Sequence, residues 1–278
     1  MTDAGMVELI ESAWADPSQA EAPEVSQAVE QAIALLDQGT IRVAEKRSGS
    51  WHTHGWVQMA ILLYFRMREA EPMKAGCLSF RDKIPVKEDL EELRVRVVPP
   101  GTARYGSFLE PGVVLMPGYV NIGAYVGTGS MIDTWATVGS GAQIGRNVHL
   151  SGGVGIGGVL EPPQSRPVIV EDGAFIGSRC VLVEGVIVEE GAVLGAGCVV
   201  TASSPIVDVR GSEPAVSRRL IPARCIAIPG TWPRRFPAGV FHAPCVMIIG
   251  ERSDSTDRKT MLNDILREFP LEMTNPAR

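Results

Sequence analysis

The chain has 278 residues, 45% hydrophobic and 21% charged, as in an ordinary globular protein. Its net charge is −6 and it has no basic run, so we expect neither a nucleic acid nor a membrane as a partner. No apolar stretch could span a bilayer and the N-terminus lacks a signal peptide, so the expected location is cytoplasmic. Five cysteines without a CxxC pair indicate a reducing compartment.

Residues 1–95 predict a helical N-terminal domain. Three segments have the apolar periodicity of amphipathic helices: residues 6–15, 24–38 and 56–69. Gly39 is the expected C-cap of the second. Residues 41–46 alternate in polarity before Ser48-Gly49-Ser50, which predicts a hairpin. Residues 72–95 have no regular pattern except a short extended piece at Lys83.

The centre of the chain has a six-residue period, which fits neither a helix nor an alternating strand. Large apolar residues occupy the repeating position in two blocks: Phe108, Val114, Val120, Val126, Ile132, Val138, Ile144, Leu150 and Ile156, then Val170, Ile176, Leu182, Val188, Leu194 and Val200. A small or slender residue stands two positions before each. This pattern predicts a parallel β-helix in which three hexads close one coil and residues 18 apart stack. The period does not determine the handedness.

The β-helix is expected over residues 96–205, interrupted where the two blocks fall out of phase. The proline-rich residues 159–167 predict a loop, which is either a binding element on a rigid scaffold or a tolerated insertion. After Val200 the period fades. Two strands, at residues 220–230 and 243–250, and a terminal helix at residues 256–269 would form a small mixed cap over residues 206–278.

Two polar residues interrupt the repeat. Asp133 follows the inward-facing Ile132, so we expect it at the surface or a corner, beside an exposed Trp135, either in an intersubunit cleft or simply solvated. His149 is the only histidine of the repeat and is either a base for an amine nucleophile or a structural, hydrogen-bonded residue. The other histidines lie outside the repeat, and no metal site is expected.

A third feature is a set of small residues. Gly158, Ser178 and Ala196 occupy the sixth position of their hexads and are expected to stack on three successive coils. Such a column either packs a corner or leaves a groove for a long, thin ligand such as the pantetheine arm of coenzyme A. Several arginines follow in sequence and could meet its phosphates: Arg210, Arg218, Arg219, Arg224, Arg234 and Arg235.

Several irregular segments carry a family resemblance: residues 96–100 (RVVPP), 115–126, 131–139 (MIDTWATVG), 143–162, 183–190 and 33–46. On these segments the chain resembles the tetrahydrodipicolinate N-succinyltransferases of lysine and diaminopimelate biosynthesis, from about residue 6 to 200. The resemblance implies a homotrimer of left-handed β-helices with coenzyme A between neighbouring subunits. It also implies acyl transfer from an acyl-CoA to the amine of a dicarboxylate acceptor.

The resemblance assigns roles to two residues. Arg96 matches the family arginine that binds an acceptor carboxylate, and Asp133 matches the aspartate that contacts the acceptor amine and orients or deprotonates it. The amine attacks the thioester directly, so no cysteine nucleophile is expected. The acyl-CoA, succinyl or acetyl, is a co-substrate, and no permanently bound cofactor is expected.

The chain departs from the family at Cys180-Val181, where Ser-Glu is expected. Either Asp133 suffices, or Glu184 or a water replaces the missing carboxylate, or the chain is a specialised relative. The tabtoxin-biosynthesis member, with acetyl-CoA as its donor, would be such a relative. A non-catalytic solenoid scaffold is the remaining alternative. The two cysteines Cys180 and Cys198 lie 18 apart and are expected to stack as packing residues.

Overall fold

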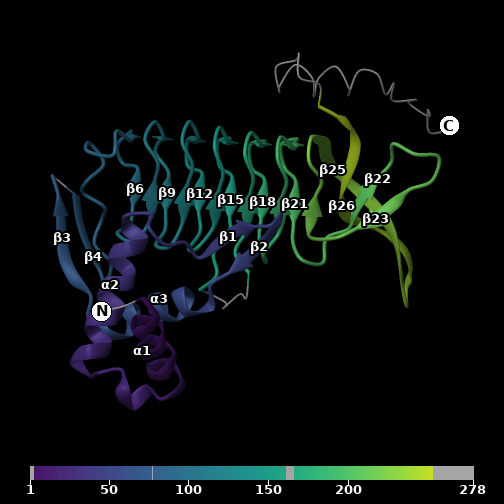
Figure 1. Ribbon diagram of the computed structural model, residues 1–278. Helices are drawn as coiled ribbons and strands as arrows, with labels where there is room; N and C mark the ends of the chain where they lie inside the picture. The colour runs from purple at the N-terminus through teal and green to yellow at the C-terminus, as the bar shows by residue number, and fades with distance from the viewer. Residues whose placement is uncertain (1–2, 77, 161–165, 253–278) are drawn as a thin grey trace.

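The computed structural model of the chain describes residues 3–76, 78–160 and 166–252 (Figure 1). Its N-terminal part contains the predicted helices: α1 (Asp3–Ala15), the 3-10 turn η1 (Pro17–Gln19), α2 (Pro23–Asp37) and α3 (Gly55–Met67). The apolar stripe of α2 is buried against α1 and α3, and Gly39, at a φ of 70°, ends the helix as expected. No helix among these residues is long and apolar enough to span a membrane.

Two hairpins accompany the helices. The predicted one pairs β1 (Ala44–Arg47) with β2 (Ser50–Thr53), antiparallel, around residues 48–49. A second, β3 (Glu71–Ala75) with β4 (Leu78–Asp82), is not predicted from the sequence. The reason is that β4 is mostly exposed and therefore carries no alternation between apolar and polar residues.

From Arg96 onward the chain winds into a prism with three parallel sheets as walls, called here sheets 1, 2 and 3 (Figure 1). Sheet 1 contains β5 (Arg96–Val97), β8 (Val114–Leu115), β11 (Met131–Ile132), β14 (His149–Leu150), β17 (Phe175–Ile176) and β20 (Val193–Leu194). Sheet 2 contains β6 (Thr102–Ala103), β9 (Tyr119–Val120), β12 (Thr137–Val138), β15 (Gly155–Ile156), β18 (Val181–Leu182) and β21 (Val199–Val200). Sheet 3 contains β7 (Phe108–Leu109), β10 (Tyr125–Val126), β13 (Gln143–Ile144), β16 (Ile169–Val170), β19 (Ile187–Val188) and β24 (Leu220–Ile221). The predicted fold class, a left-handed parallel β-helix with a helical N-terminal region, is confirmed.

The second residue of each strand from β6 to β21 faces the solenoid core and is at most 3% exposed. The predicted inward residues are therefore correct from Val120 onward. They are wrong for Phe108 and Val114, whose places in the core are taken by Leu109 and Leu115. The step from Leu115 to Val120 is five residues instead of six, and a shift of one residue exchanges the inward and outward faces of a strand.

The C-terminal strands extend sheet 1 past the last coil. β25 (Cys225–Phe236) pairs in parallel with β20 and antiparallel with β26 (Gly239–Glu251), and β22 (Ile206–Asp208) and β23 (Ala215–Ser217) follow. The strand predicted at residues 243–250 is confirmed and is longer than expected, as β26. The strand predicted at residues 220–230 is wrong as a single element, because its first residues form β24 in sheet 3 and β25 begins only at Cys225. The predicted helix at residues 256–269 and the centre of the predicted loop, residues 161–165, lie outside the described residues.

The described cysteines are buried free thiols: Cys180, Cys198, Cys225 and Cys245. Cys180 and Cys198 stack on successive coils as predicted, and the Cys180 thiol donates to the carbonyl of Gly195 at 3.1 Å. Burial raises the pKa of the Cys225 thiol to about 12, so its thiolate is scarce at neutral pH.

We therefore expect Cys180, Cys198 and Cys225 to resist alkylation by iodoacetamide at pH 8 in the native protein and to react fully in denaturant. Peptide mass spectrometry after timed labelling measures this. Modification of any of the three at the rate of a free thiol would contradict the burial described here.

Candidate active site

Asp133 lies at the corner where one coil passes from sheet 1 to sheet 2. Ile132 before it is fully buried, and the amide of Ala136 donates to the Asp133 carbonyl at 2.9 Å to close the turn. Trp135 has a φ of 59° and is 64% exposed, as predicted. The carboxylate oxygen Oδ1 accepts the amide of Thr134 at 2.7 Å. The turn thus fixes one oxygen of Asp133 and leaves the other for a neighbour.

That neighbour is His149 on β14, the next strand of sheet 1. Its Nε2 lies 3.8 Å from Oδ2 of Asp133, and its ring stacks on Phe175 with centroids 5.1 Å apart. A cavity of about 260 Å³ opens beside the pair, with Ser151 and Ser178 also on its wall. The structure therefore brings together an acidic and an imidazole side chain, the pairing needed to accept a proton from an amine.

The predicted column of small residues is correct for two of its three members. Ser178 and Ala196 stack at the ends of β17 and β20 and line the same cavity as Asp133. Gly158 is misplaced in the prediction: it follows β15 in sheet 2, packs against Ser140 and lines a different cavity. The register of β14 with β17 places Gly152 next to Ser178 instead.

Arg96 lies on the same sheet as Asp133, at its first strand. Its side chain is exposed and faces outward from β5, and β8 and β11 are the next two strands of the sheet. Adjacent strands are about 4.8 Å apart, so Arg96 and Asp133 are separated by about 10 Å along the solenoid axis. Its guanidinium makes no hydrogen bond or ion pair with the part of the chain that the structure describes. It does not line the cavity of Asp133.

Val181, at the departure from the family pattern, lies on β18 of sheet 2 and is 37% exposed. It does not line the cavity of Asp133. The alternative carboxylate, Glu184, is already engaged, because its Oε2 accepts the amide of Ala202 at 2.9 Å. Among the described residues of one chain, Asp133 is therefore the carboxylate that faces this cavity.

Two cavity residues, Ser151 and Phe175, are not singled out by the sequence. Phe175 is the ring on which His149 stacks, yet the two are 26 residues apart. The residues inserted before β16 hide the 18-residue spacing that would have placed them side by side. Of the arginines expected near the coenzyme phosphates, Arg210 is held by Asp208 and Glu251, at 2.6 and 2.5 Å. No cluster suited to a metal ion occurs among the described residues.

A solenoid of hexapeptide coils with Asp133 and His149 beside a corner cavity is the architecture of the hexapeptide-repeat transferases. Residues 167–202 match the family model described as "Hexapeptide repeat of succinyl-transferase", and residues 6–67 match "Tetrahydrodipicolinate N-succinyltransferase N-terminal". The chain belongs to the tetrahydrodipicolinate N-succinyltransferase family, as the following relatives establish.

Three proteins named 2,3,4,5-tetrahydropyridine-2,6-dicarboxylate N-succinyltransferase align with nearly the whole chain. The protein of Variovorax paradoxus is 48% identical over 94% of this chain and 98% of its own length. That of Albidiferax ferrireducens is 50% identical over 94% and 97%. That of Acinetobacter baylyi is 48% identical over 88% and 90%.

Proposed function

We propose that this protein transfers the succinyl group of succinyl-CoA to the amine of tetrahydrodipicolinate in its hydrated or ring-opened form. The names of relatives that match over almost their full length support the reaction. The observation that carries the proposal is that Asp133 and the small residues Ser178 and Ala196 line one cavity. This geometry puts a carboxylate for the amine next to a groove that can admit the arm of an acyl-CoA.

In the proposed reaction the amine nitrogen attacks the thioester carbonyl, the new C–N bond forms and the C–S bond breaks. Coenzyme A leaves as a thiolate, which takes up a proton, and the amine loses one. Asp133 accepts a hydrogen bond from the amine and, with His149 at 3.8 Å, provides the place to which this proton moves. No acyl-enzyme is required, which agrees with the burial of the described cysteines.

The identity of the acyl donor is a separate part of the proposal, because acetyl-CoA is the alternative to succinyl-CoA. A thiol-release assay with the purified protein, the acceptor and each acyl-CoA in turn distinguishes the two. We expect a higher kcat/KM with succinyl-CoA; a preference for acetyl-CoA would favour a specialised relative. Absence of thiol release with every donor would reject the proposed reaction and favour a non-catalytic scaffold.

We assign acceptor binding to Arg96, whose exposed guanidinium suits bidentate contact with a carboxylate. Arg96→Ala should raise the KM for the acceptor by about 10- to 100-fold, because a hydrogen bond to a charged group is lost. The KM for acyl-CoA should remain unchanged. Arg81→Ala, which removes an exposed arginine from β4, is the control. An effect confined to the acyl-CoA KM would make this assignment wrong.

We further propose a cytoplasmic homotrimer with its sites between subunits. Asp133 opens at a corner beside sheet 1, whereas position 181, where the family is expected to carry a glutamate, projects from sheet 2. Val181 and Val199 form an exposed apolar pair on sheet 2, which suits contact with another subunit. Sedimentation equilibrium tests the assembly: a monomer at micromolar concentration would contradict a shared site.

A further inference from the structure

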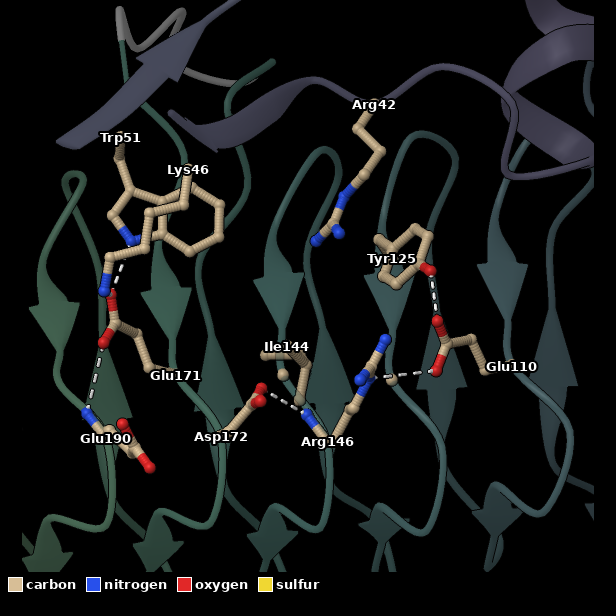
Figure 2. Close-up of a pocket in the computed structure, with 12 residues that line it drawn as sticks. Arg42, Lys46, Trp51, Glu110, Tyr125, Ile144, Arg146, Glu171, Asp172 and Glu190 are labelled. Atoms are coloured by element: carbon tan, nitrogen blue, oxygen red, sulfur yellow. Dashed lines mark hydrogen bonds and ion pairs between the residues drawn. The ribbon is translucent and has the colours of Figure 1, made fainter. Parts of the chain in front are cut away.

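A second polar cavity, of about 280 Å³, lies on sheet 3, away from the corner that holds Asp133 (Figure 2). Its floor is formed by residues of β10 and β13, and its roof by the N-terminal segment that leads through Arg42 into the β1–β2 hairpin. The cavity therefore joins two parts of the chain that are distant in sequence.

One end of this cavity is closed by hydrogen bonds that attach the β1–β2 hairpin to Glu171 of the solenoid. The Glu171 carboxylate is 10% exposed and accepts hydrogen bonds from Lys46 Nζ at 2.8 Å and Trp51 Nε1 at 2.7 Å. It also accepts the amide of Glu190 at 3.3 Å. These contacts hold the hairpin on the solenoid and leave Glu171 with no role toward a ligand.

The other end holds a cation without an anion. The Arg42 guanidinium lies 3.6 Å over the ring of Tyr125, and its Nε donates to Gln143 Oε1 at 2.8 Å. No carboxylate oxygen of the described residues lies within 4.0 Å of it. Glu110, also on the cavity wall, accepts hydrogen bonds from the Tyr125 hydroxyl and the Thr128 amide and lies 3.9 Å from Arg146 Nε. Arg42 is half-buried. Burial lowers the pKa of its guanidinium, and the nearby Tyr125 is the main group that opposes this shift. The Arg42 guanidinium therefore has an aromatic ring and an amide oxygen as partners, and no anion in the part of the chain that the structure describes.

The remaining side chains give the cavity a positively charged part and a negatively charged part. Figure 2 shows the guanidinium groups of Arg42 and Arg146 directed toward the space between them. Asp172 uses Oδ1 to accept the amide of Arg146 at 2.8 Å. The second oxygen of Asp172 and the carboxylate of Glu190 have no hydrogen bond within the described part of the chain.

We propose that this cavity binds a small zwitterionic amino acid. Its carboxylate would lie on the free Nη groups of Arg42, the fork geometry that arginine offers to a carboxylate. Its ammonium group would face Asp172 and Glu190. A dicarboxylate would bring a second negative charge toward those two residues, and a simple amine would leave Arg42 without an anion, so the zwitterion is the best electrostatic match.

Binding at this place would link the N-terminal segment to sheet 3 and stabilise the folded protein by mass action. The test measures the melting temperature of the full-length protein with each of the twenty standard L-amino acids, followed by calorimetric titration of those that raise it. Acetate and methylamine at equal concentration are the single-charge controls. We expect at least one amino acid to raise the melting temperature and neither control to do so.

Two variants locate the site. Arg42→Gln should weaken binding of that amino acid at least tenfold, whereas Arg47→Gln, at an exposed arginine of the adjoining β1–β2 hairpin, should leave it unchanged. Should Arg42→Gln loosen the hairpin, Asp172→Asn provides a second reading, because asparagine keeps the acceptor for the Arg146 amide and removes only the charge. It too should weaken binding at least tenfold.

Three results would overturn the proposal: no amino acid raises the melting temperature, acetate binds as tightly as the amino acid, or both variants bind like the parent. The last result would place the ligand elsewhere, for example beside Asp133. Because the readout is binding without acyl transfer, it is independent of the proposed reaction.

Discussion

Replacement of Asp133 by asparagine is expected to lower kcat by about 10²- to 10⁴-fold, the range for a lost acid–base group. Asparagine retains an oxygen for the Thr134 amide, which Asp133 accepts at 2.7 Å, so the corner should keep its shape. The variant removes the negative charge that we propose faces the amine and that lies beside His149. The measurement is the initial rate of thiol release at saturating acyl-CoA and acceptor, with the assembly checked by gel filtration.

The control is Asp208→Asn, which changes an aspartate paired with Arg210 in the C-terminal sheet and should leave kcat unaltered. His149→Gln separates the two members of the pair. We expect it to reduce kcat less than Asp133→Asn does; an equal or larger loss would assign the proton transfer to the imidazole. Unchanged turnover in Asp133→Asn would remove Asp133 from the active site.

Replacement of Gly139 by alanine is expected to destabilise the solenoid by roughly 3 kcal/mol, the upper part of the range for overpacking. A Cβ at this position would lie 2.5 Å from the carbonyl carbon of Gly157 and 2.6 Å from the oxygen of Ile156, and closer still to the amide of Gly158. All three are backbone atoms of the next coil, which cannot move without opening the stack. The melting temperature should fall by about 6–12 °C.

Gly155→Ala is the matched control for this substitution. Gly155 lies in the solenoid, and the nearest atom of the same chain to an added Cβ, Cγ2 of Val181, is 4.0 Å away. Alanine there should leave the melting temperature unchanged or raise it slightly, since glycine weakens a strand. Equal melting temperatures for Gly139→Ala and the parent would mean that the coils are not as close as described.

The period of six was sufficient to predict the coils because each hexad contains its own strand and its own corner. It did not fix the phase at the first coils, where Phe108 and Leu109, like Val114 and Leu115, are adjacent apolar residues that fit the inward position equally well. The burial of Leu109 and Leu115 resolves the choice. Phe108, turned outward, makes a ring contact with Tyr125 at 5.4 Å.

The candidate site was predictable where its members lie within an unbroken block. Asp133 follows Ile132 directly, and Ser178 and Ala196 are separated by one regular coil. Gly158 was misplaced because the loop before β16 makes one coil 26 residues long, as the pairing of Gly155 with Val181 records. The length of a loop carries no information about register, so only the pairing of the strands could show that Gly152 stands beside Ser178.

The sequence by itself determined the β-helix, its inward residues from Val120 onward and the corner position of Asp133, because all three follow from a period that the backbone repeats locally. The tertiary structure decided what lies side by side across the interruption of the repeat and across domains: His149 with Phe175, and Arg42 with Gln143, 101 residues away. These contacts depend on the strand register after the insertion and on where the β1–β2 hairpin packs against the solenoid. Neither is encoded in a local repeat.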